Sequence, residues 1–248
     1  MNTTPSYSIS VLIPALNEQI GIKRTISALP IKKLADQGHE LEVIVIDGIS
    51  TDKTAEVARE MGAKVILEER KGYGRAYKTG FRAAKGDVIV TLDGDGTYPA
   101  ELIGDYVQLL NEEKLDFITV NRFSKMENGT MLFSHQIGNR ILSFAMRVLY
   151  SVKVKDSQSG MWIMSKRFID KINLVSDDFS LSEEIKIIAF KFFKAIELDG
   201  QYYTRVGKQK LVTFEDGWNN LKYLFKYKSL LNSSIHSIPE VLERRKLE

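Results

Sequence analysis

Residues 88–99 have the sequence VIVTLDGDGTYP, in which a run of apolar, β-favouring residues ends at two aspartates. Asp93 and Asp95 are one residue apart, and Gly94 and Gly96 leave little side-chain bulk beside them. Short Val, Ile and Leu runs are typical of strands buried on both faces of a parallel sheet. In an open parallel sheet, ligands bind beyond the carboxyl ends of the strands. The stretch therefore predicts a buried strand with a charged ligand site at its end.

Further apolar runs flank this strand, and segments with helical spacing separate them. The other predicted strands of the first half are SISVLIP, LEVIVID, AKVILEE and LDFITVNRF. Helices are predicted over residues 18–29, 52–61 and 73–84 and in YPAELIGDYVQLLNEEK. After residue 122 the pattern is less regular, with a long apolar and basic helix over about residues 131–150, a short strand GMWIMS and a helix SEEIKIIAFKFFKA. The alternation predicts an α/β fold with a mostly parallel central sheet flanked by helices.

The composition is typical of a globular protein, with 44% hydrophobic and 27% charged residues. A length of 248 residues suits one large α/β domain, so we expect residues 1–248 to form a single domain. The absence of cysteine excludes disulfides and thiolate metal sites. MNTTPSYS lacks the basic and apolar regions of a signal peptide, and no apolar run approaches the roughly 18 residues of a spanning helix. We therefore expect a cytoplasmic protein that does not cross a membrane.

Polar residues follow four of the predicted strands. They are Asn17 and Glu18, then Asp47, then residues 68–71, and then Asp93 with Asp95. The carboxyl ends of parallel strands meet at one edge of a sheet, so these side chains are expected on one rim. They are either a binding site or ordinary turn residues.

A second concentration of charge lies between residues 122 and 155. The net charge of the chain is only +3, yet the only acid in this segment before residue 155 is Glu127. Its basic residues are Arg122, Lys125, Arg140, Arg147, Lys153 and Lys155. The local asymmetry suggests an anionic partner.

Asp93 and Asp95 are the candidate metal ligands. Two carboxylates at positions i and i+2 repel each other unless a cation lies between them, and hard oxygen ligands suit Mg²⁺ or Mn²⁺ shared with substrate phosphates. An EF-hand calcium loop also begins with Asp-x-Asp-Gly, but its twelfth position should be glutamate and is Gly104 here. The EF-hand is therefore excluded.

The segment KGYGRAYKTG, residues 71–80, is a glycine-rich turn before a predicted helix. Tyr77 occupies the third glycine position of a G-x-G-x-x-G motif, which excludes a nicotinamide cofactor. Lys71, Gly74 and Arg75 then lie near a helix N-terminus, a place suited to a phosphate. An ordinary loop with solvated bases is the alternative.

Together these segments resemble the nucleotide-sugar half of the inverting glycosyltransferases of family two, which have a GT-A fold. The resemblance rests on VLIPALNE, VIVIDGISTDKTAEVA, KGYGRAYKTGF and GDVIVTLDGDGTYP. VKDSQSGMWIMSK and YYTRVGKQKL resemble the D-x-x-S-G-F-R and R-x-G-x-S-K-L segments of the dolichyl-phosphate or polyprenyl-phosphate sugar transferases in that family. The likeness covers about residues 8–212. It implies a GT-A domain in which residues 1–122 bind the nucleotide sugar and residues 123–248 bind the acceptor near a membrane.

The resemblance also implies residue roles. Asn17, Glu18 and Asp47 would hold the nucleoside, and Asp95, supported by Asp93, would hold the metal on the diphosphate. The catalytic candidates are Asp95, Asp156, Arg205 and Glu184. The substrate-binding candidates are Pro14, Ala15, Asn17, Glu18, Asp47, Lys71, Gly74, Arg75, Asp93, Arg122, Arg140, Gln158, Ser159, Lys208 and Lys210.

Two departures from the family pattern bear on the donor. Gly48 and Ile49 replace the middle of the usual Asp-Asp-Gly-Ser motif. DGDGTYP replaces the Asp-Ala-Asp-Leu-Gln that is usual in dolichyl-type mannosyl transferases, which favours a UDP-sugar over GDP-mannose.

The nature of the acceptor decides which residues matter. A phosphate monoester is already anionic near neutral pH, because its second pKa is about 6, and it needs cations rather than a base. The candidate cations are Arg122, Arg140, Arg205, Lys208 and Lys210, with Ser159 and the Gly160 backbone as hydrogen-bond donors. A hydroxyl acceptor would need a base such as Glu183 or Glu184, which are otherwise acids favoured at a helix N-terminus.

Two basic segments have amphipathic spacing. MLFSHQIGNRILSFAMRVLY places Ile137, Ile141, Ala145 and Val148 along one face, and WNNLKYLFKYKSLL combines aromatic residues with lysines. Such helices either lie in the headgroup layer of a membrane or pack on the sheet with solvated outer faces.

The expected protein is a metal-dependent enzyme on the cytoplasmic face of a membrane. It would transfer a sugar, glucose or an N-acetylhexosamine, from a UDP-sugar to a polyprenyl or dolichyl phosphate with inversion, using Mg²⁺ or Mn²⁺ and no nucleic acid. The alternatives are a GDP-mannose-dependent dolichyl-phosphate mannosyl transferase, a soluble glycosyltransferase with a hydroxyl acceptor, and a non-catalytic nucleotide-sugar binding subunit.

Overall fold

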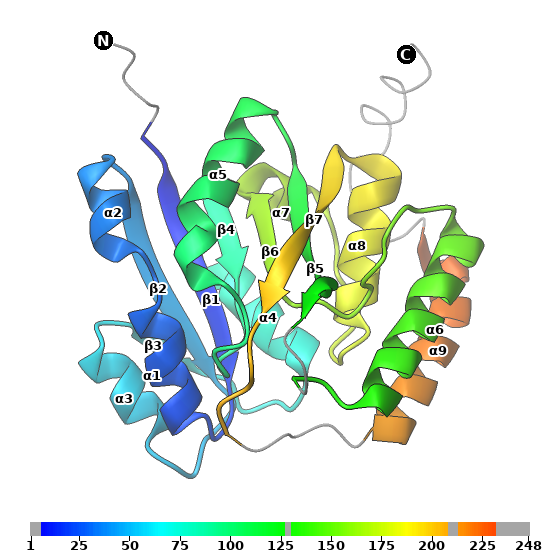
Figure 1. The fold of residues 1–248 in the computed structure, drawn as a ribbon, viewed down its shortest axis with the longest axis horizontal. Helices are drawn as coiled ribbons and strands as arrows, with labels where there is room; N and C mark the ends of the chain where they lie inside the picture. Colours follow the sequence, from blue (N-terminus) through cyan, green and yellow to red (C-terminus); the bar gives the residue numbers. More distant parts are fainter. Residues whose placement is uncertain (1–5, 127–129, 208–212, 232–248) are drawn as a thin grey trace.

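A seven-stranded sheet with the strand order β3-β2-β1-β4-β6-β5-β7 forms the centre of the protein (Figure 1). The computed structural model describes residues 6–126, 130–207 and 213–231. The strands are β1 (Ser8–Ala15), β2 (Glu40–Asp47), β3 (Lys64–Leu67), β4 (Val88–Thr91), β5 (Phe117–Met126), β6 (Trp162–Ser165) and β7 (Ala195–Tyr202). Strand β6 is antiparallel to its neighbours β4 and β5, whereas the other neighbouring strands pair in parallel. The predicted α/β class with a mostly parallel sheet is confirmed.

Helices cover both faces of this sheet (Figure 1). They are α1 (Gln19–Ser27), α2 (Ile31–Asp36), α3 (Thr54–Glu60), α4 (Tyr73–Ala83), the 3₁₀ helix η1 (Ala100–Leu102), α5 (Ile103–Glu112), α6 (Phe133–Tyr150), α7 (Lys166–Lys171), α8 (Leu181–Phe192) and α9 (Thr213–Leu230). Side chains alternate along a strand, so Leu12 belongs to the core with α4, α6 and α8, while Ile13 belongs to the core with α1 and α5. The sheet is therefore buried on both faces, as its continuous apolar runs predict.

Strand β7 and the short helices α2 and α7 have no clear signal in the sequence. Strand β7 has the sequence AIELDGQY, in which Glu197, Asp199 and Gly200 interrupt the apolar pattern. It lies at the edge of the sheet and pairs with β5, so its partner strand defines it rather than its own composition. The six-residue helix α2 is similarly too short for a periodic signal.

The carboxyl ends of β1, β2, β4, β5 and β7 meet at one rim, the lower edge in Figure 1. Because β6 runs the other way, the loop that leads into it, residues 156–161, reaches the same rim. The segment after β7 also lies there, since the Tyr203 amide donates to the Thr97 carbonyl and the Val206 amide to the Asp95 carbonyl. Three segments distant in sequence are thus brought around the two aspartates.

Helix α6 lies beside α9 at one edge of the molecule (Figure 1). It packs inward through Leu142, Met146 and Tyr150. Its outward face is also apolar, and the large side chains there are between 44% and 74% exposed: Phe133, Ile137, Ile141, Phe144 and Val148. We call these five residues the α6 stripe. Among the described helices, none is long and apolar enough to cross a membrane.

Candidate functional site

Asp93 lies just beyond the end of β4, close to Tyr73, Gly160 and Asp95. Its Oδ1 accepts a hydrogen bond of 3.3 Å from the Tyr73 hydroxyl. A Cβ on Gly160 would come within 3.0 Å of the same oxygen, so the absence of a side chain there lets the backbone approach. Burial, and then the neighbouring charge of Asp95, raise the pKa of Asp93 to about 7. The charges of Arg122 and Arg205 offset this rise only in part, so the site can accept further positive charge.

Asp95 is buried and is held from two sides. The Thr97 hydroxyl donates to its Oδ1 at 2.7 Å, and Nη1 of Arg205 donates to its Oδ2 at 2.7 Å. The other terminal nitrogen of Arg205 donates to Glu18 Oε1. Arg205, from the segment after β7, therefore joins a carboxylate at the end of β1 to one at the end of β4. The structure brings together these three predicted site residues across 187 positions of sequence.

Asp93 and Asp95 are the carboxylates that could hold a divalent cation. Within residues 6–126, 130–207 and 213–231, no group of three His, Asp or Glu side chains forms a metal site. Mg²⁺, however, is commonly bound by one or two carboxylates while water and substrate phosphates supply the other ligands. The charge deficit at Asp93 fits that chemistry, and Asp95 would exchange its bond from Arg205 for the cation. The residues present therefore fit Mg²⁺ or Mn²⁺ held jointly with a diphosphate.

The predicted nucleoside residues lie at the ends of β1 and β2. Ala15 pairs with Asp47, and Pro14 with Ile46, in the register of these strands. Asp47 accepts a hydrogen bond of 3.0 Å from the Ser50 amide, and the Thr51 amide donates to Asn17 Oδ1 at 2.7 Å. These contacts fix the two loops against each other and leave Asn17 on the surface of the rim.

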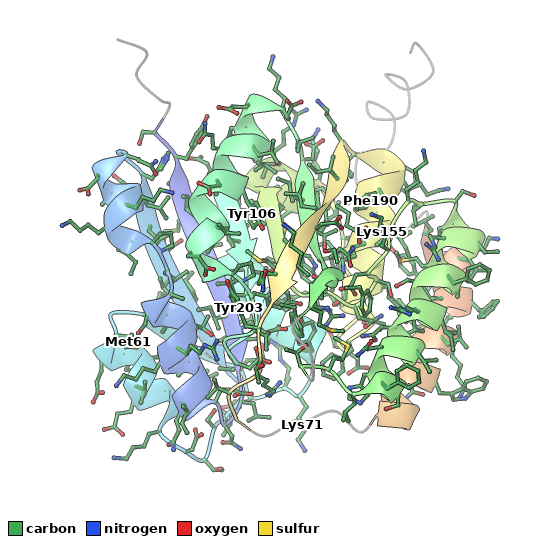
Figure 2. The ribbon with its side chains drawn as sticks, in the orientation of Figure 1. Met61, Lys71, Tyr106, Lys155, Phe190 and Tyr203 are labelled. Carbon is green, nitrogen blue, oxygen red and sulfur yellow. The ribbon has the colours of Figure 1, made fainter. Side chains whose placement is uncertain are left out.

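The glycine-rich turn is bound by the protein itself. The Arg75 amide, in the first turn of α4, donates to the Asp177 carbonyl at 2.9 Å, and the Arg75 guanidinium pairs with the Asp177 carboxylate. A Cβ on Gly74 would lie 2.7 Å from the Ser176 carbonyl oxygen, so this glycine serves close packing. Lys71 is exposed and extends from the lower edge of the molecule (Figure 2). Of the predicted phosphate residues in this turn, Lys71 is the one that faces solvent.

Arg122 and Asp156 form a buried ion pair. Nε and Nη2 of Arg122 donate to the two carboxylate oxygens of Asp156 at 2.7 and 2.8 Å. The Arg122 guanidinium also lies 5.4 Å from the centroid of the Tyr202 ring. Burial alone would raise the pKa of Asp156, but the Arg122 charge and hydrogen bonds hold it below its usual range. The predicted acceptor cation and a predicted catalytic acid are thus engaged with each other.

The loop of residues 156–160 carries the other candidates of the D-x-x-S-G segment. Gln158 donates to Glu183 Oε1 at 2.8 Å, and the Ser159 carbonyl accepts from the Trp162 indole at 2.8 Å. The Gly160 amide, expected as a donor to the acceptor, donates to the Tyr98 hydroxyl at 2.7 Å. The loop is therefore bound on all sides by the fold at the rim.

Glu184 is fully buried in α8. It accepts hydrogen bonds of 2.8 Å from the amides of Val175 and Ser176 and one of 3.0 Å from the Tyr223 hydroxyl. Burial raises its pKa, as it does for Glu183. These contacts engage the Glu184 carboxylate in the packing of α8 against residues 175–176 and α9, and they leave it with no exposed surface.

A cavity of about 400 Å³ lies between β5, β7 and α6. Its lining is Asn121, Phe123, Ser124, Arg140, Arg147, Lys155 and Asp199. The Arg140 guanidinium lies 5.7 Å from the centroid of the Phe123 ring, and Figure 2 shows Lys155 between β7 and α6. Three residues of the basic segment predicted to meet an anion thus share one cavity. We call it the basic cavity.

Two residues of the basic cavity and two tyrosines near Asp93 were not predicted as site residues. Arg147 and Lys155 were noted for their charge but not as site residues, and Tyr73 and Tyr98 were not singled out at all. The aromatic pair has no motif of its own, and only the packing of α4 and of the loop after β4 brings it to Asp93. Lys208 and Lys210 lie outside the described residues.

The sequence of this chain matches a known protein family and several relatives. Residues 10–172 match the family described as Glycosyl transferase family 2. A low-salt glycan biosynthesis hexosyltransferase of Haloferax volcanii is 32% identical over 88% of this chain and 53% of its own length. A dolichyl-phosphate hexose transferase of the same organism is 30% identical over 84% of this chain and 89% of its own length. The chain thus spans about half of the first relative and most of the second.

Solved structures show the same fold. Glucosyl-3-phosphoglycerate synthase from Mycobacterium tuberculosis, in complex with phosphoglyceric acid, superposes with a TM-score of 0.71 at 22% identity, covering 90% of this chain and 80% of that one. A complex of that enzyme with Mn²⁺, UDP-glucose and phosphoglyceric acid gives a TM-score of 0.70 at 21% identity, with the same coverage.

Proposed function

The chain belongs to glycosyl transferase family 2, and from that premise we propose that it transfers a sugar from a UDP-sugar to a polyprenyl or dolichyl phosphate. It is a glycosyltransferase related to dolichyl-phosphate hexose transferases, with the GT-A fold of that family. We further propose that residues 1–248 form one domain, with residues 1–122 on the donor side and residues 123–248 on the acceptor side.

The observation that carries the acceptor assignment is the basic cavity. Arg140 and Arg147 of α6 and Lys155 of the loop before β6 converge there, beside the carboxyl-terminal half of β5. A hydroxyl acceptor would instead call for a carboxylate base, and the predicted base Glu184 is occupied by three fold contacts. Glu183, the other candidate base, is fully buried and accepts a hydrogen bond of 2.8 Å from Gln158. Positive charge without an exposed base therefore favours an acceptor that is already ionised.

The reaction is then a single displacement. An oxygen of the acceptor phosphate attacks the anomeric carbon as the bond from that carbon to the donor diphosphate breaks, so the configuration inverts and UDP leaves with the electron pair. A bound Mg²⁺ or Mn²⁺, held by Asp95 with Asp93, would neutralise the diphosphate. Arg205, which pairs with Asp95 at 2.7 Å, would add a second positive charge there. The basic cavity offsets the repulsion between the two anions.

The α6 stripe supports a membrane-bound acceptor. Its five exposed apolar side chains lie on the helix that also supplies Arg140 and Arg147 to the basic cavity. Trp218 and Phe225 are likewise exposed on the neighbouring helix α9, among lysines. Apolar side chains flanked by basic ones suit a peripheral position in an anionic headgroup layer, which we place on the cytoplasmic face.

One panel tests the function. The enzyme is incubated with UDP- or GDP-sugars and Mn²⁺ against three acceptors: polyprenyl phosphate, 3-phosphoglycerate and a sugar without phosphate. Lipid-linked product from a UDP-sugar is expected. Product from 3-phosphoglycerate alone would assign the basic cavity to a small phosphorylated acceptor. Product from the neutral sugar would overturn the assignment of a phosphate acceptor. A preference for GDP-sugars would overturn the assignment of a UDP-sugar donor.

A matched pair of variants links the panel to the cavity. Arg147→Met removes a charge from the basic cavity, whereas Lys153→Met removes one from an exposed site outside its lining. The KM for the acceptor should rise at least about tenfold in the first variant and stay unchanged in the second, since a charge-assisted contact is worth about 1.5–3 kcal/mol. Equal effects would contradict the assignment.

A further inference from the structure

A buried lysine lies beneath the 156–160 loop. Lys186 in α8 has no exposed surface, and its ammonium donates to the carbonyl oxygens of Asp156, Ser157 and Ser159 at 2.9, 2.9 and 2.7 Å. An ammonium has three N–H donors, so these carbonyls use all of them. Burying a charge is costly, and a lysine persists in such a place when the groups around it need a cation.

The three carbonyls belong to the loop that carries the acceptor-side candidates. Asp156 holds Arg122, and Gly160 follows directly after Ser159 and packs against Asp93. A loop whose carbonyls turn inward toward one point cannot hold that shape without a donor at the point, because the carbonyls repel one another and lack water.

We propose that Lys186 is a positioning residue for the transfer reaction, which holds the 156–160 loop so that the Arg122–Asp156 pair and the Gly160 backbone keep their places beside Asp93. The expected effect on kcat rests on the proposed function, whereas the expected effect on the 156–160 loop does not. Lys186 touches no reacting atom; it acts through the loop. Its role differs from general core packing, because the contacts are polar and converge on one segment of five residues.

The electrostatics support the same role. Burial lowers the pKa of Lys186 to about 7, although the negative charge of Asp156 acts to raise it. The charged groups around it come from three other segments as well as from α8: Arg122, Asp156, Glu183 and Glu197. A neutral amine would have two N–H donors instead of three, so deprotonation of Lys186 would leave one loop carbonyl without its partner.

Two readouts test the loop directly. Lys186→Met keeps the length of the side chain but removes every donor, and Lys191→Met, an exposed site on the same helix, is the matched control. Amide hydrogen exchange at residues 156–160 should become at least about tenfold faster in Lys186→Met and remain unchanged in Lys191→Met, while exchange in β1 and β2 stays slow. In a Trp218→Phe background, Trp162 is the remaining tryptophan and lies 6.0 Å from the Lys186 ammonium. Its emission should change as the pH passes about 7 and should not do so in Lys186→Met.

Kinetics give the functional outcome. In Lys186→Met, kcat should fall about 100-fold, since a shift of about 1 Å in a catalytic group can cost that much, while the KM for the nucleotide sugar stays within about twofold. The kcat of Lys186→Gln, which keeps two N–H donors, should lie between those of wild type and Lys186→Met. If Lys186→Met does not fold, the kcat and the loop exchange of Lys186→Gln test the proposal in its place. Loop exchange and kcat equal to those of Lys191→Met would overturn the proposal. If no acceptor gives turnover even in wild type, the proposed function fails, whereas the exchange and emission results still decide the role of Lys186 in the loop.

Discussion

The buried pair of Arg122 and Asp156 makes a sharp stability prediction. Arg122→Met removes one partner and leaves a carboxylate with no exposed surface. Two charges about 4 Å apart attract by about 4 kcal/mol at an effective dielectric constant of about 20, and breaking a buried pair commonly costs about 3–5 kcal/mol. Arg122→Met should therefore lower the free energy of unfolding by about 3–5 kcal/mol. The control, Lys125→Met, changes an exposed residue of the same strand and should cost under about 0.5 kcal/mol.

Urea denaturation with linear extrapolation measures both values, and its pH dependence supplies a second test. In wild type the pKa of Asp156 is below its ordinary value. The ion pair therefore contributes its full stabilisation at pH values above the ordinary pKa of an aspartate. This stabilisation is lost as the pH falls through the lowered pKa. In Arg122→Met, burial without the guanidinium raises the pKa of Asp156, so the variant can bind a proton. Its deficit relative to wild type should shrink as the pH falls from 7 to 5.

A double-mutant cycle isolates the pair. Asp156→Asn in the Arg122→Met background removes the unpaired charge, so the double variant should be more stable than the sum of the single changes by at least about 2 kcal/mol. A loss below about 1 kcal/mol in Arg122→Met, with no dependence on pH, would refute this reasoning. Arg122 would then be free to serve as a direct phosphate ligand.

Three further outcomes are expected. Asp95→Asn should leave the fold intact, abolish Mn²⁺ binding in calorimetry and lower kcat at least about 100-fold; undiminished Mn²⁺ binding would exclude the metal role. Gly160→Ala would place a Cβ 2.4 Å from the Tyr73 hydroxyl and should lower the free energy of unfolding by about 1–3 kcal/mol. Gly138→Ala, whose Cβ would have no atom within 4 Å, should raise it by about 0.5–1 kcal/mol by stabilising α6. Equal shifts in Tm for the two variants would contradict this expectation. Phe144→Glu should weaken binding to anionic vesicles at least about tenfold without changing Tm, and unchanged flotation would remove the α6 stripe from the membrane surface.

The strands and their order along the first half of the chain were predictable from local patterns. Short apolar runs such as VIVT and SVLIP are typical of doubly buried strands, and nearby glycine, proline and aspartate residues mark their limits. The metal candidates Asp93 and Asp95 followed for the same reason, because a carboxylate pair at a strand end is a local signal. The edge strand β7 was not predictable, since pairing with β5 rather than its own residues makes it a strand.

The sequence by itself determined the α/β class, the rim that holds the site and the family; the tertiary structure alone decided what each charge at that rim contacts. Arg122 and Arg75 look alike as free cations in the sequence, yet both are paired, with Asp156 and Asp177, whereas Arg140 and Arg147 line the basic cavity. The outward face of α6 was equally undecided, because its helix is apolar on both sides and only packing against the core selects one of them. The physical reason is common to all three: ion pairs, cavities and helix faces depend on contacts between residues far apart in the chain, and local composition does not encode which of several chemically equivalent groups will meet.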